Sequence, residues 1–416
     1  MPDLSLVDPL SNNILLKKLG KIISRQEALV KLRELPVLPD RLYELSRDER
    51  LRLIPRIRPF HVPRQVEARL FESIDSMIRE GYSYRDPESP ATFADLSGED
   101  VWYAKPKMPP TGAAVNGPAG CGKSVSILLC LGLFPQAVRH QNFPRIEGSH
   151  VQIVWQSSEA PKSGRTEDLW RTLMEDMDAI TGDGRFAERL ATKRSRVSAS
   201  AALQEWLTVA KGHFLGLLHI DEIQNLFRLS AVARRRKLES GAAPPDLTVV
   251  EDETLRWLLA IMNAGIPLLV SGTPDGIEAL SRRLSTLQRF TSTGSHLFLP
   301  FRNHEDKDYR RFMDNLSDYQ FTVGKFDLDD EFLKHLFKLT AGVPRIIMSL
   351  WVLANRIALE SSKDCLEPKH FDVAEAKFLV PLRPAVQALL NPVSVQQRHI
   401  DSALQVVGRA YRTSTP

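Results

Sequence analysis

The stretch that decides the fold is Gly117-Pro118-Ala119-Gly120-Cys121-Gly122-Lys123-Ser124. It fits the pattern G-x-x-x-x-G-K-[ST], in which glycines let backbone N–H groups turn inward around phosphates. The apolar residues 113–115 precede it, and a helix-compatible run follows from Val125. Strand, loop and helix therefore stand in the order that the motif requires, and the helix N-terminus favours an anion.

This loop predicts that the chain binds ATP and Mg²⁺. We expect Lys123 to reach the β and γ phosphates and the hydroxyl of Ser124 to bind Mg²⁺. The expected nucleotide-binding residues are Gly117, Pro118, Ala119, Gly120, Cys121, Gly122, Lys123, Ser124 and Val125.

An acidic pair supplies the second half of the expected site. The apolar residues 217–220 run into Asp221 and Glu222, about 100 residues after the loop. Asp221 is expected to hold Mg²⁺ together with Ser124, and Glu222 to act as the general base that orients and deprotonates water. His219, inside the apolar run, is interpreted as a packed core histidine.

Polar and basic residues follow at the ends of later elements. Thr273, or less favourably Ser271, is the candidate for sensing the γ-phosphate, with helix capping before a proline as an equal alternative. Arg289 is expected to reach a neighbouring subunit's nucleotide, and Arg345, in a Gly-Val-Pro-Arg segment at a helix start, to contact the γ-phosphate. For Arg289 the alternative is an ordinary exposed arginine.

The rest of the chain predicts an α/β protein with helical flanks. Residues 1–95 read as mostly helical, with one helix from Pro63 that ends at Gly81. Residues 96–300 alternate strands with helices, which favours a parallel sheet covered on both faces. Residues 301–380 show helical periodicity alone, and 381–416 form a polar tail. The expected strands are Ala113–Asn116, Val151–Trp155, Leu215–Ile220, Ile266–Ser271 and His296–Leu299.

Composition excludes several classes of protein. The chain has 416 residues, 43% of them hydrophobic and 25% charged, with a net charge of +4, so it is not disordered throughout. Three cysteines, none in a Cys/His cluster, are too few for a disulfide framework and argue against a zinc site. The longest apolar run, 125–134, is half a membrane span, so we expect a cytoplasmic protein without a membrane partner.

The loop, the Asp-Glu pair, the polar strand tip and the two arginines together resemble an AAA+ ATPase over about residues 95–380. This resemblance implies a P-loop NTPase core with a five-stranded parallel sheet (96–300) and a helical lid (301–380). It also implies that Lys123, Ser124, Asp221, Glu222 and the sensor and finger residues carry ATP hydrolysis.

Local segments resemble the TnsC/TniB transposition regulators of Tn-seven-type transposons. They are His219-Ile220-Asp221-Glu222-Ile223-Gln224-Asn225-Leu226, Val270-Ser271-Gly272-Thr273-Pro274, Leu287-Gln288-Arg289-Phe290, Arg56-Ile57-Arg58-Pro59-Phe60 and residues 81–87. The resemblance implies an ATP-bound homo-oligomer, a ring or helical filament on duplex DNA, that links a target selector or CRISPR effector to transposase subunits. Residues 1–95 and 381–416 are then expected to contact partners.

Two basic clusters are candidates for DNA contact, which needs only phosphate contacts and no base reading. Taken alone, either cluster is better interpreted as a solvated helix face, and it is the resemblance that favours DNA contact for the first. The first contains Lys162, Arg165, Arg185, Arg189, Lys193, Arg194 and Arg196, and the second contains Arg47, Arg50, Arg52, Arg56, Arg58 and Arg64. Nucleotide or subunit contacts are equally compatible with the second cluster, and residues 228–253 resemble an insertion without an assigned role.

Two alternative functions stay open. The chain reads also as an AAA+ ATPase of a secretion or signalling system without a DNA role, or as a scaffold that binds ATP and hydrolyses little of it. The complete set of hydrolytic residues, with Asp221, Glu222 and Arg289, argues against the scaffold. A small-molecule P-loop kinase does not explain the acidic pair combined with the Arg345 segment.

Overall fold

The computed structural model describes residues 12–97, 109–184, 186, 199–227, 248–281 and 288–391. Its chain contacts form two compact units. The first comprises Met1–Arg25, Val66–Asn116 and Ser124–Leu297, and the second Gln26–Gln65, Gly117–Lys123 and Phe298–Pro416. Residues 1–95, treated as one segment in the sequence analysis, therefore contribute to both units.

The first unit is built on a five-stranded sheet in the order β4-β5-β6-β1-β7, and every pair in it is parallel. All five residues of β1 are buried, which suits an apolar strand at an interior position. Asn116, the last residue of β1, pairs with Gly272, the last residue of β6. The strands are β1 (Gly112–Asn116), β4 (Trp155–Glu159), β5 (Leu217–Asp221), β6 (Leu268–Gly272) and β7 (Gly294–Leu297).

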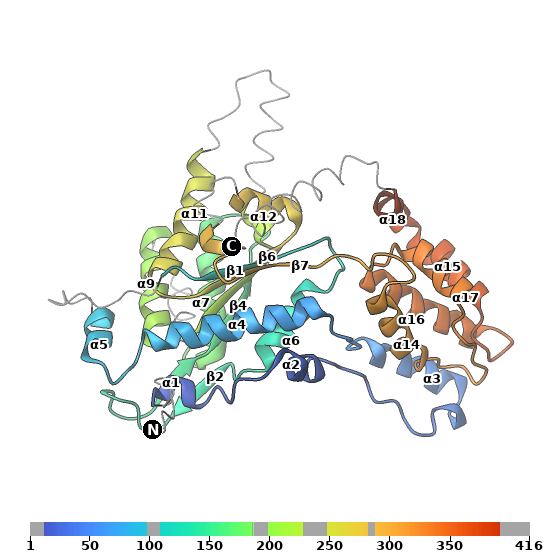
Figure 1. Cartoon of the computed structure of the whole chain (residues 1–416), viewed down its shortest axis with the longest axis horizontal. Coiled ribbons are helices and arrows are strands. Elements are labelled where there is room, and N and C mark those ends of the chain that lie inside the picture. The colour runs from blue at the N-terminus through green and yellow to red at the C-terminus, as the bar shows by residue number, and fades with distance from the viewer. Residues whose placement is uncertain are drawn as a thin grey trace, which may run out of the picture. The chain divides into compact units, whose positions relative to one another are not determined.

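Helices pack against this sheet, and one core cluster joins strand residues such as Ile220 and Val270 to Leu173, Trp206 and Ile261. These last three lie on α7, α9 and α11. Figure 1 shows α4 running along the front of the sheet. The main helices of the unit are α4 (Gln65–Ser83), α5 (Pro90–Ser97), α6 (Lys123–Gly132), α7 (Thr166–Thr181), α9 (Ala199–Gly212), α11 (Thr248–Asn263) and α12 (Pro274–Ser281).

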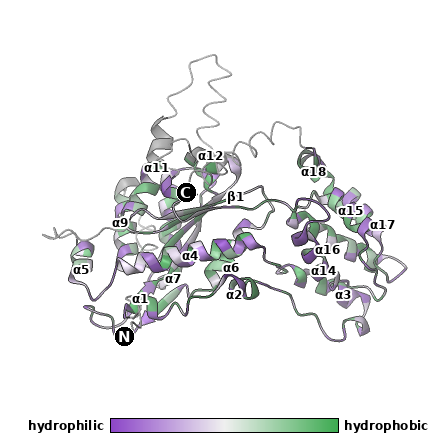
Figure 2. Cartoon of the chain, viewed as in Figure 1, coloured by the Kyte–Doolittle hydropathy of each residue, from purple (hydrophilic) through white to green (hydrophobic). Residues whose placement is uncertain are grey.

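Helix α4 shows why an amphipathic sequence packs here. Leu70, Ile74 and Met77 are buried on one stripe, and Figure 2 shows hydrophobic and hydrophilic residues alternating around the helix. The expected end at Gly81 is wrong, because the helix continues to Ser83. Tyr82, in that last turn, is fully buried, and its hydroxyl donates to the carbonyl oxygen of Ile153.

The expected strand Val151–Trp155 is two strands. β3 (His150–Ile153) pairs antiparallel with β2 (Ala137–His140) in a separate two-stranded sheet, and β4 begins after Val154. The backbone N–H of Val154 donates to Gln136, outside both sheets. An apolar run cannot by itself reveal such a change of partner, because periodicity does not report which strand pairs with which.

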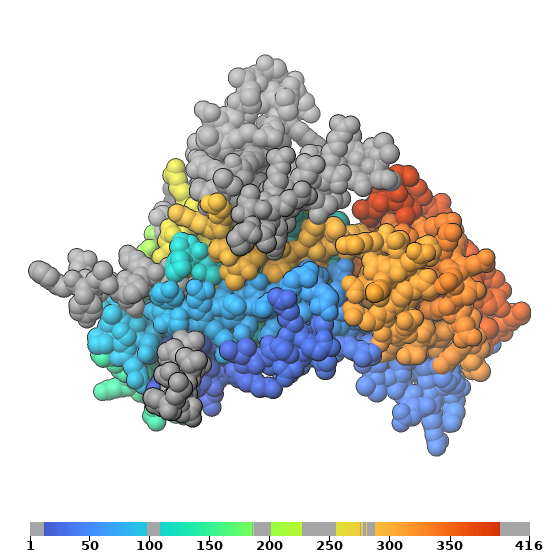
Figure 3. All heavy atoms as spheres, in the orientation of Figure 1, coloured from blue at the N-terminus to red at the C-terminus, as the bar shows by residue number. Residues whose placement is uncertain are grey.

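The second unit is helical, as expected for the lid. Its core joins Phe312, Leu336, Leu350 and Trp351 to Ile57 from the N-terminal region. In Figure 3 the N-terminal residues (blue) lie directly against the later residues of this unit (orange). Its helices are α2 (Arg25–Lys31), α3 (Arg47–Leu53), α14 (Lys307–Ser317), α15 (Asp330–Thr340), α16 (Pro344–Glu360), α17 (Pro368–Ala374) and α18 (Arg383–Leu390), with short helical turns η1 (Leu42–Glu44), η2 (Ile54–Ile57), η4 (Glu375–Leu379) and η5 (Val380–Leu382).

Among the described residues, no single helix has both the length and the apolar composition needed to cross a membrane. One pair passes by length and composition only, α15 with α16, and it is bent by 114° at the break. Both helices contribute buried side chains to the core of the second unit.

Candidate functional site

The loop 117–122 connects β1 to α6, and its glycines adopt conformations that other residues avoid. Gly120 and Gly122 have φ of 85° and 90°, in the left-handed region. A Cβ on Gly117 would lie 2.0 Å from the carbonyl oxygen of Phe298, which only glycine avoids. The sequence motif therefore has the local backbone that it predicts.

Three cations surround this loop within the second unit. Lys123 donates from Nζ to the carbonyl oxygens of Gly117 (2.7 Å) and Pro118 (3.1 Å). The backbone N–H of Arg345, in the first turn of α16, donates to the carbonyl oxygen of Gly120 at 3.1 Å. The structure thus places the backbone of Arg345 beside the loop, with its side chain exposed, and its contact with the γ-phosphate stays a prediction.

Arg64 is the third cation, and sequence reasoning missed this role. It donates to the carbonyl oxygens of Leu299 (2.7 Å) and Cys121 (3.0 Å), and it lies over the rings of Phe298 and Phe301. Burial raises the pKa of the Cys121 thiol to about 11, although the nearby cations oppose the shift. Cys121 is therefore a neutral packed thiol, and Arg64 supports the loop backbone.

The expected metal ligands meet in the first unit. The side chain of Ser124 is close enough to that of Asp221 to lower the pKa of the Asp221 carboxyl. Burial acts to raise the pKa of Asp221, but His219 and hydrogen bonds from Ser124, Ser271 and the Glu222 N–H outweigh it and hold the pKa below its ordinary value. An ionised carboxylate next to a hydroxyl is a donor set that suits Mg²⁺.

A row of hydrogen bonds behind Asp221 fixes its carboxylate. Ser271 donates to Asp221, so its oxygen accepts from Nε2 of His219 at 2.8 Å, and Nδ1 of His219 accepts from the hydroxyl of Ser157 at 2.8 Å. Burial lowers the pKa of His219 to about 4. His219 is buried as expected, and it also connects β4, β5 and β6 as a neutral ring.

Glu222 directly follows β5 and Thr273 directly follows β6, at the ends of two neighbouring strands. Glu222 has φ of 53°, unusual for a residue with a side chain, and its N–H donates to Asp221 at 2.8 Å. The carbonyl oxygen of Thr273 accepts from the N–H groups of Gly276 and Ile277, and these two bonds form the first turn of α12. Its hydroxyl makes no such cap and has no hydrogen-bond partner among the described residues.

Asn116 is a further polar residue that sequence reasoning missed. Its Oδ1 is buried and likewise lacks a partner in the described part of the chain. Because β1 and β6 are neighbours, Asn116 and Thr273 bring two unsatisfied polar atoms to the same edge of the sheet. Buried polar atoms are normally paired, so these two fit a site built for a polar ligand. The available signal was a polar residue that ends an apolar strand directly before Gly117.

The remaining expected residues are less constrained. Arg289 is exposed in a helical turn before β7, and Lys162 and Arg165 are exposed before α7. The expected contacts Arg189, Lys193, Arg194 and Arg196 lie outside the described residues, as do Arg185 and most of the 228–253 segment.

The second basic cluster divides into structural and exposed members. Arg50 pairs with Asp364 and donates to the carbonyl oxygen of Phe321, and Arg47 donates to the carbonyl oxygen of Ser361. Arg64 supports the loop. Arg52, Arg56 and Arg58 are exposed and are therefore the members available for a partner.

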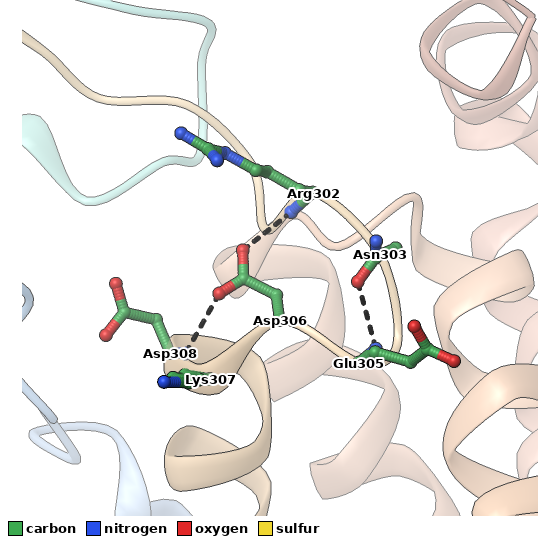
Figure 4. A pocket seen from close by; sticks show the side chains of 6 residues that line it. All are labelled: Arg302, Asn303, Glu305, Asp306, Lys307 and Asp308. Atoms are coloured by element: carbon green, nitrogen blue, oxygen red, sulfur yellow. Dashed lines mark hydrogen bonds between the residues drawn. The ribbon is translucent and has the colours of Figure 1, made fainter.

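A hollow in the second unit lies just before α14 (Figure 4). Asp306 accepts from the backbone N–H groups of Arg302 (3.0 Å) and Asp308 (2.9 Å), and Asn303 accepts from that of Glu305 (3.0 Å). These bonds shape the turn and cap α14, so the hollow is explained by the start of the helix.

Residues 110–280 match the family model described as "AAA domain". This segment is therefore similar to an AAA domain. It contains the loop, the acidic pair and the Thr273 strand tip, and with the parallel five-stranded sheet it confirms the predicted α/β AAA+ P-loop fold. The placement in the TnsC/TniB family stays a prediction.

The search of curated proteins found no significant match. Among solved structures, the chain is similar to the Aeropyrum pernix ORC1 protein in complex with DNA (14% identity, 85% of this chain and 69% of that one, TM-score 0.40). It is also similar to Drosophila ORC bound to DNA (13%, 86% and 67%, 0.38) and to the Thermotoga maritima RuvB Holliday junction branch migration motor (13%, 70% and 72%, 0.31).

Proposed function

We propose that this chain is a Mg²⁺-dependent ATPase that assembles on duplex DNA and regulates transposition. The observation that carries the ATPase is the match of residues 110–280 to an AAA domain, with the loop at 117–124 and with Ser124 close enough to Asp221 to lower its pKa. The DNA and transposition parts are supported by the TnsC/TniB resemblance and by the exposed basic residues Lys162 and Arg165.

The residues of this chain have separate roles in the proposed reaction. Lys123 and the loop N–H groups bind the phosphates, and Ser124 with Asp221 hold Mg²⁺, which when bound offsets phosphate charge. Glu222 takes the proton from the attacking water while the bond between the γ-phosphorus and the β–γ bridging oxygen breaks, which gives ADP and phosphate. Thr273 and Arg345 contact the γ-phosphate.

The proposed assembly is a homo-oligomer, a ring or filament, in which Arg289 serves the neighbouring subunit's nucleotide. Residues 1–95 and 381–416 are the segments proposed to meet the target selector or CRISPR effector and the transposase subunits. In this proposal the protein works in the cytoplasm.

ATP hydrolysis with and without Mg²⁺ tests the enzyme. We expect Lys123→Ala to abolish nucleotide binding and assembly, and Glu222→Gln to keep binding while trapping the assembly, because it spares the Mg²⁺ ligand. Equal assembly by Lys123→Ala and the wild type would refute nucleotide-gated assembly.

Electron microscopy with ATP and duplex DNA tests the assembly. Rings or filaments support the proposal, and a strictly monomeric particle refutes it. An ATPase rate that DNA leaves unchanged, without salt-sensitive retention on duplex, favours the secretion or signalling alternative. A bound nucleotide that is not turned over favours the scaffold.

A matched pair of double variants tests where DNA binds. Lys162→Ala/Arg165→Ala and Arg56→Ala/Arg58→Ala each remove two exposed cations, one pair from each cluster. If the first cluster binds DNA, only the first pair lowers the slope of log K against log salt, by about 2. The reverse result would move the DNA surface to the second cluster.

A further inference from the structure

We propose that Gln224 is a positioning residue for ATP hydrolysis, which holds the carboxylate of Glu222 and links it to the backbone at Thr273. This inference rests on the proposed ATPase function. Gln224 lies in the short turn η3 (Ile223–Phe227), two residues after Glu222. All three residues belong to the first unit.

The two ends of the Gln224 amide contact the two proposed functional segments. Its Nε2 donates to Oε2 of Glu222, and its Oε1 accepts from the backbone N–H of Thr273 at 3.1 Å. The orientation of the amide follows from these partners. A carboxylate can only accept and a backbone N–H can only donate, so a flipped amide would lose both bonds.

Two glycines make room for this side chain. A Cβ on Gly272 would lie 2.6 Å from Oε1 of Gln224, and one on Gly276 would lie 2.7 Å from its Cβ and 2.9 Å from its backbone N and Cα. Neither glycine has φ in the left-handed region, so the backbone conformation does not require them. The close approach of Gln224 to the Thr273 turn does require them.

The backbone around Glu222 is also held firmly. Its left-handed φ is maintained by its own N–H bond to Asp221 (2.8 Å) and by the N–H of Asn225, which donates to the Glu222 carbonyl oxygen at 2.8 Å. A side chain that leaves this fixed backbone still has its own rotatable bonds, and the hydrogen bond from Gln224 restrains the carboxylate at its end.

The hydroxyl of Thr273 connects the hydrogen bonds of Gln224 to the proposed recognition of ATP. It is buried without a partner among the described residues, while the N–H of the same residue is bonded to Gln224. When this hydroxyl engages the γ-phosphate, a shift of the Thr273 backbone is passed through the Gln224 amide to the Glu222 carboxylate. Gln224 thereby couples recognition of ATP to the placement of the base.

Gln224→Met tests the inference, because methionine keeps the length of the side chain and removes both hydrogen bonds. We expect kcat to fall 10- to 100-fold, the effect of losing a hydrogen bond to a charged group, with KM and the Kd for ATP changed less than threefold. The matched control is Gln204→Met, the same change at an exposed position of α9, which should leave kcat within twofold.

A double variant separates positioning from general damage. In the Glu222→Gln background, measured by single turnover, Gln224→Met should lower the rate less than threefold further, because its role passes through the carboxylate. If Gln224→Met lowers the hydrolysis rate by the same factor in the wild-type and Glu222→Gln backgrounds, the inference is overturned. A wild-type kcat in folded Gln224→Met would overturn it as well.

Gly276→Ala keeps the inference testable if Gln224→Met unfolds. The added methyl presses on Gln224 and should give the same loss of kcat at unchanged Kd for ATP, and a normal kcat would overturn the inference. If the wild-type protein hydrolyses no ATP, the proposed function fails instead, and it fails equally if Glu222→Gln does not slow the wild-type reaction.

Discussion

Ser271→Ala is the change that tests the hydrogen-bond row behind Asp221 most directly. Ser271 is fully buried on β6, donates to Asp221 and accepts from Nε2 of His219 at 2.8 Å. Alanine is nearly the same size, so little packing is lost. The change removes a hydrogen bond to a carboxylate and leaves a buried N–H of His219 without an acceptor.

These two losses determine how far Ser271→Ala should lower the free energy of unfolding. A hydrogen bond to a charged group contributes about 1.5–3 kcal/mol, and an unsatisfied buried donor costs about 1–3 kcal/mol. Because the two are not fully additive, we expect Ser271→Ala to lower the free energy of unfolding by about 3 kcal/mol. Urea unfolding followed by circular dichroism measures this quantity.

Ser126→Ala is the matched control. Ser126 is also buried in the first unit, on α6, but its hydroxyl has no hydrogen-bond partner among the described residues. Its replacement should be neutral or stabilising by about 0.5 kcal/mol, because alanine favours a helix. If Ser271→Ala is no more destabilising than Ser126→Ala, the hydrogen-bond row is wrong.

Three other changes test separate parts of the molecule. Burial lowers the pKa of His296 to about 4, so the unfolded state binds its proton first. Stability therefore falls as pH drops from about 6.5 to 4, by up to about 3 kcal/mol from this residue. His296→Gln should make the pH dependence of the free energy of unfolding less steep, measured by urea unfolding at each pH, while His219 keeps part of it. Arg50→Met removes the closest ion-pair partner of Asp364, which keeps Arg47 at 3.5 Å and the N–H of Val323 at 3.1 Å. The change should cost about 2–3 kcal/mol near neutral pH, the contribution of a hydrogen bond to a charged group. Since the hydrogen bond from Arg50 lowers the pKa of Asp364, the loss should shrink as acid protonates that carboxyl. Gly117→Ala places a methyl against Phe298 and should abolish ATP binding, measured with a fluorescent analogue, while binding at wild-type affinity would contradict the loop geometry.

Much of the fold could be predicted because its signals are local. The loop 117–124 is one continuous stretch, and its glycine pattern, the preceding strand and the following helix all depend on neighbours in the sequence. The strand-helix alternation likewise predicts a parallel sheet, which the structure and the AAA domain match confirm. Boundaries were less accurate: Gly81 stays inside α4, and the run at 151–155 divides between two sheets.

The candidate site also has features that local sequence predicts and features that depend on tertiary contacts. The sequence by itself determined which residue types stand at the loop and at the strand ends, since Lys123, Ser124, Asp221 and Glu222 belong to short motifs. Only the tertiary structure decided what holds them. Ser271 reaches Asp221, Gln224 reaches Thr273, and Arg64 reaches the carbonyl oxygen of Cys121. These partners are about 50 residues apart or more, and such contacts depend on how strands and turns pack, which no local pattern records.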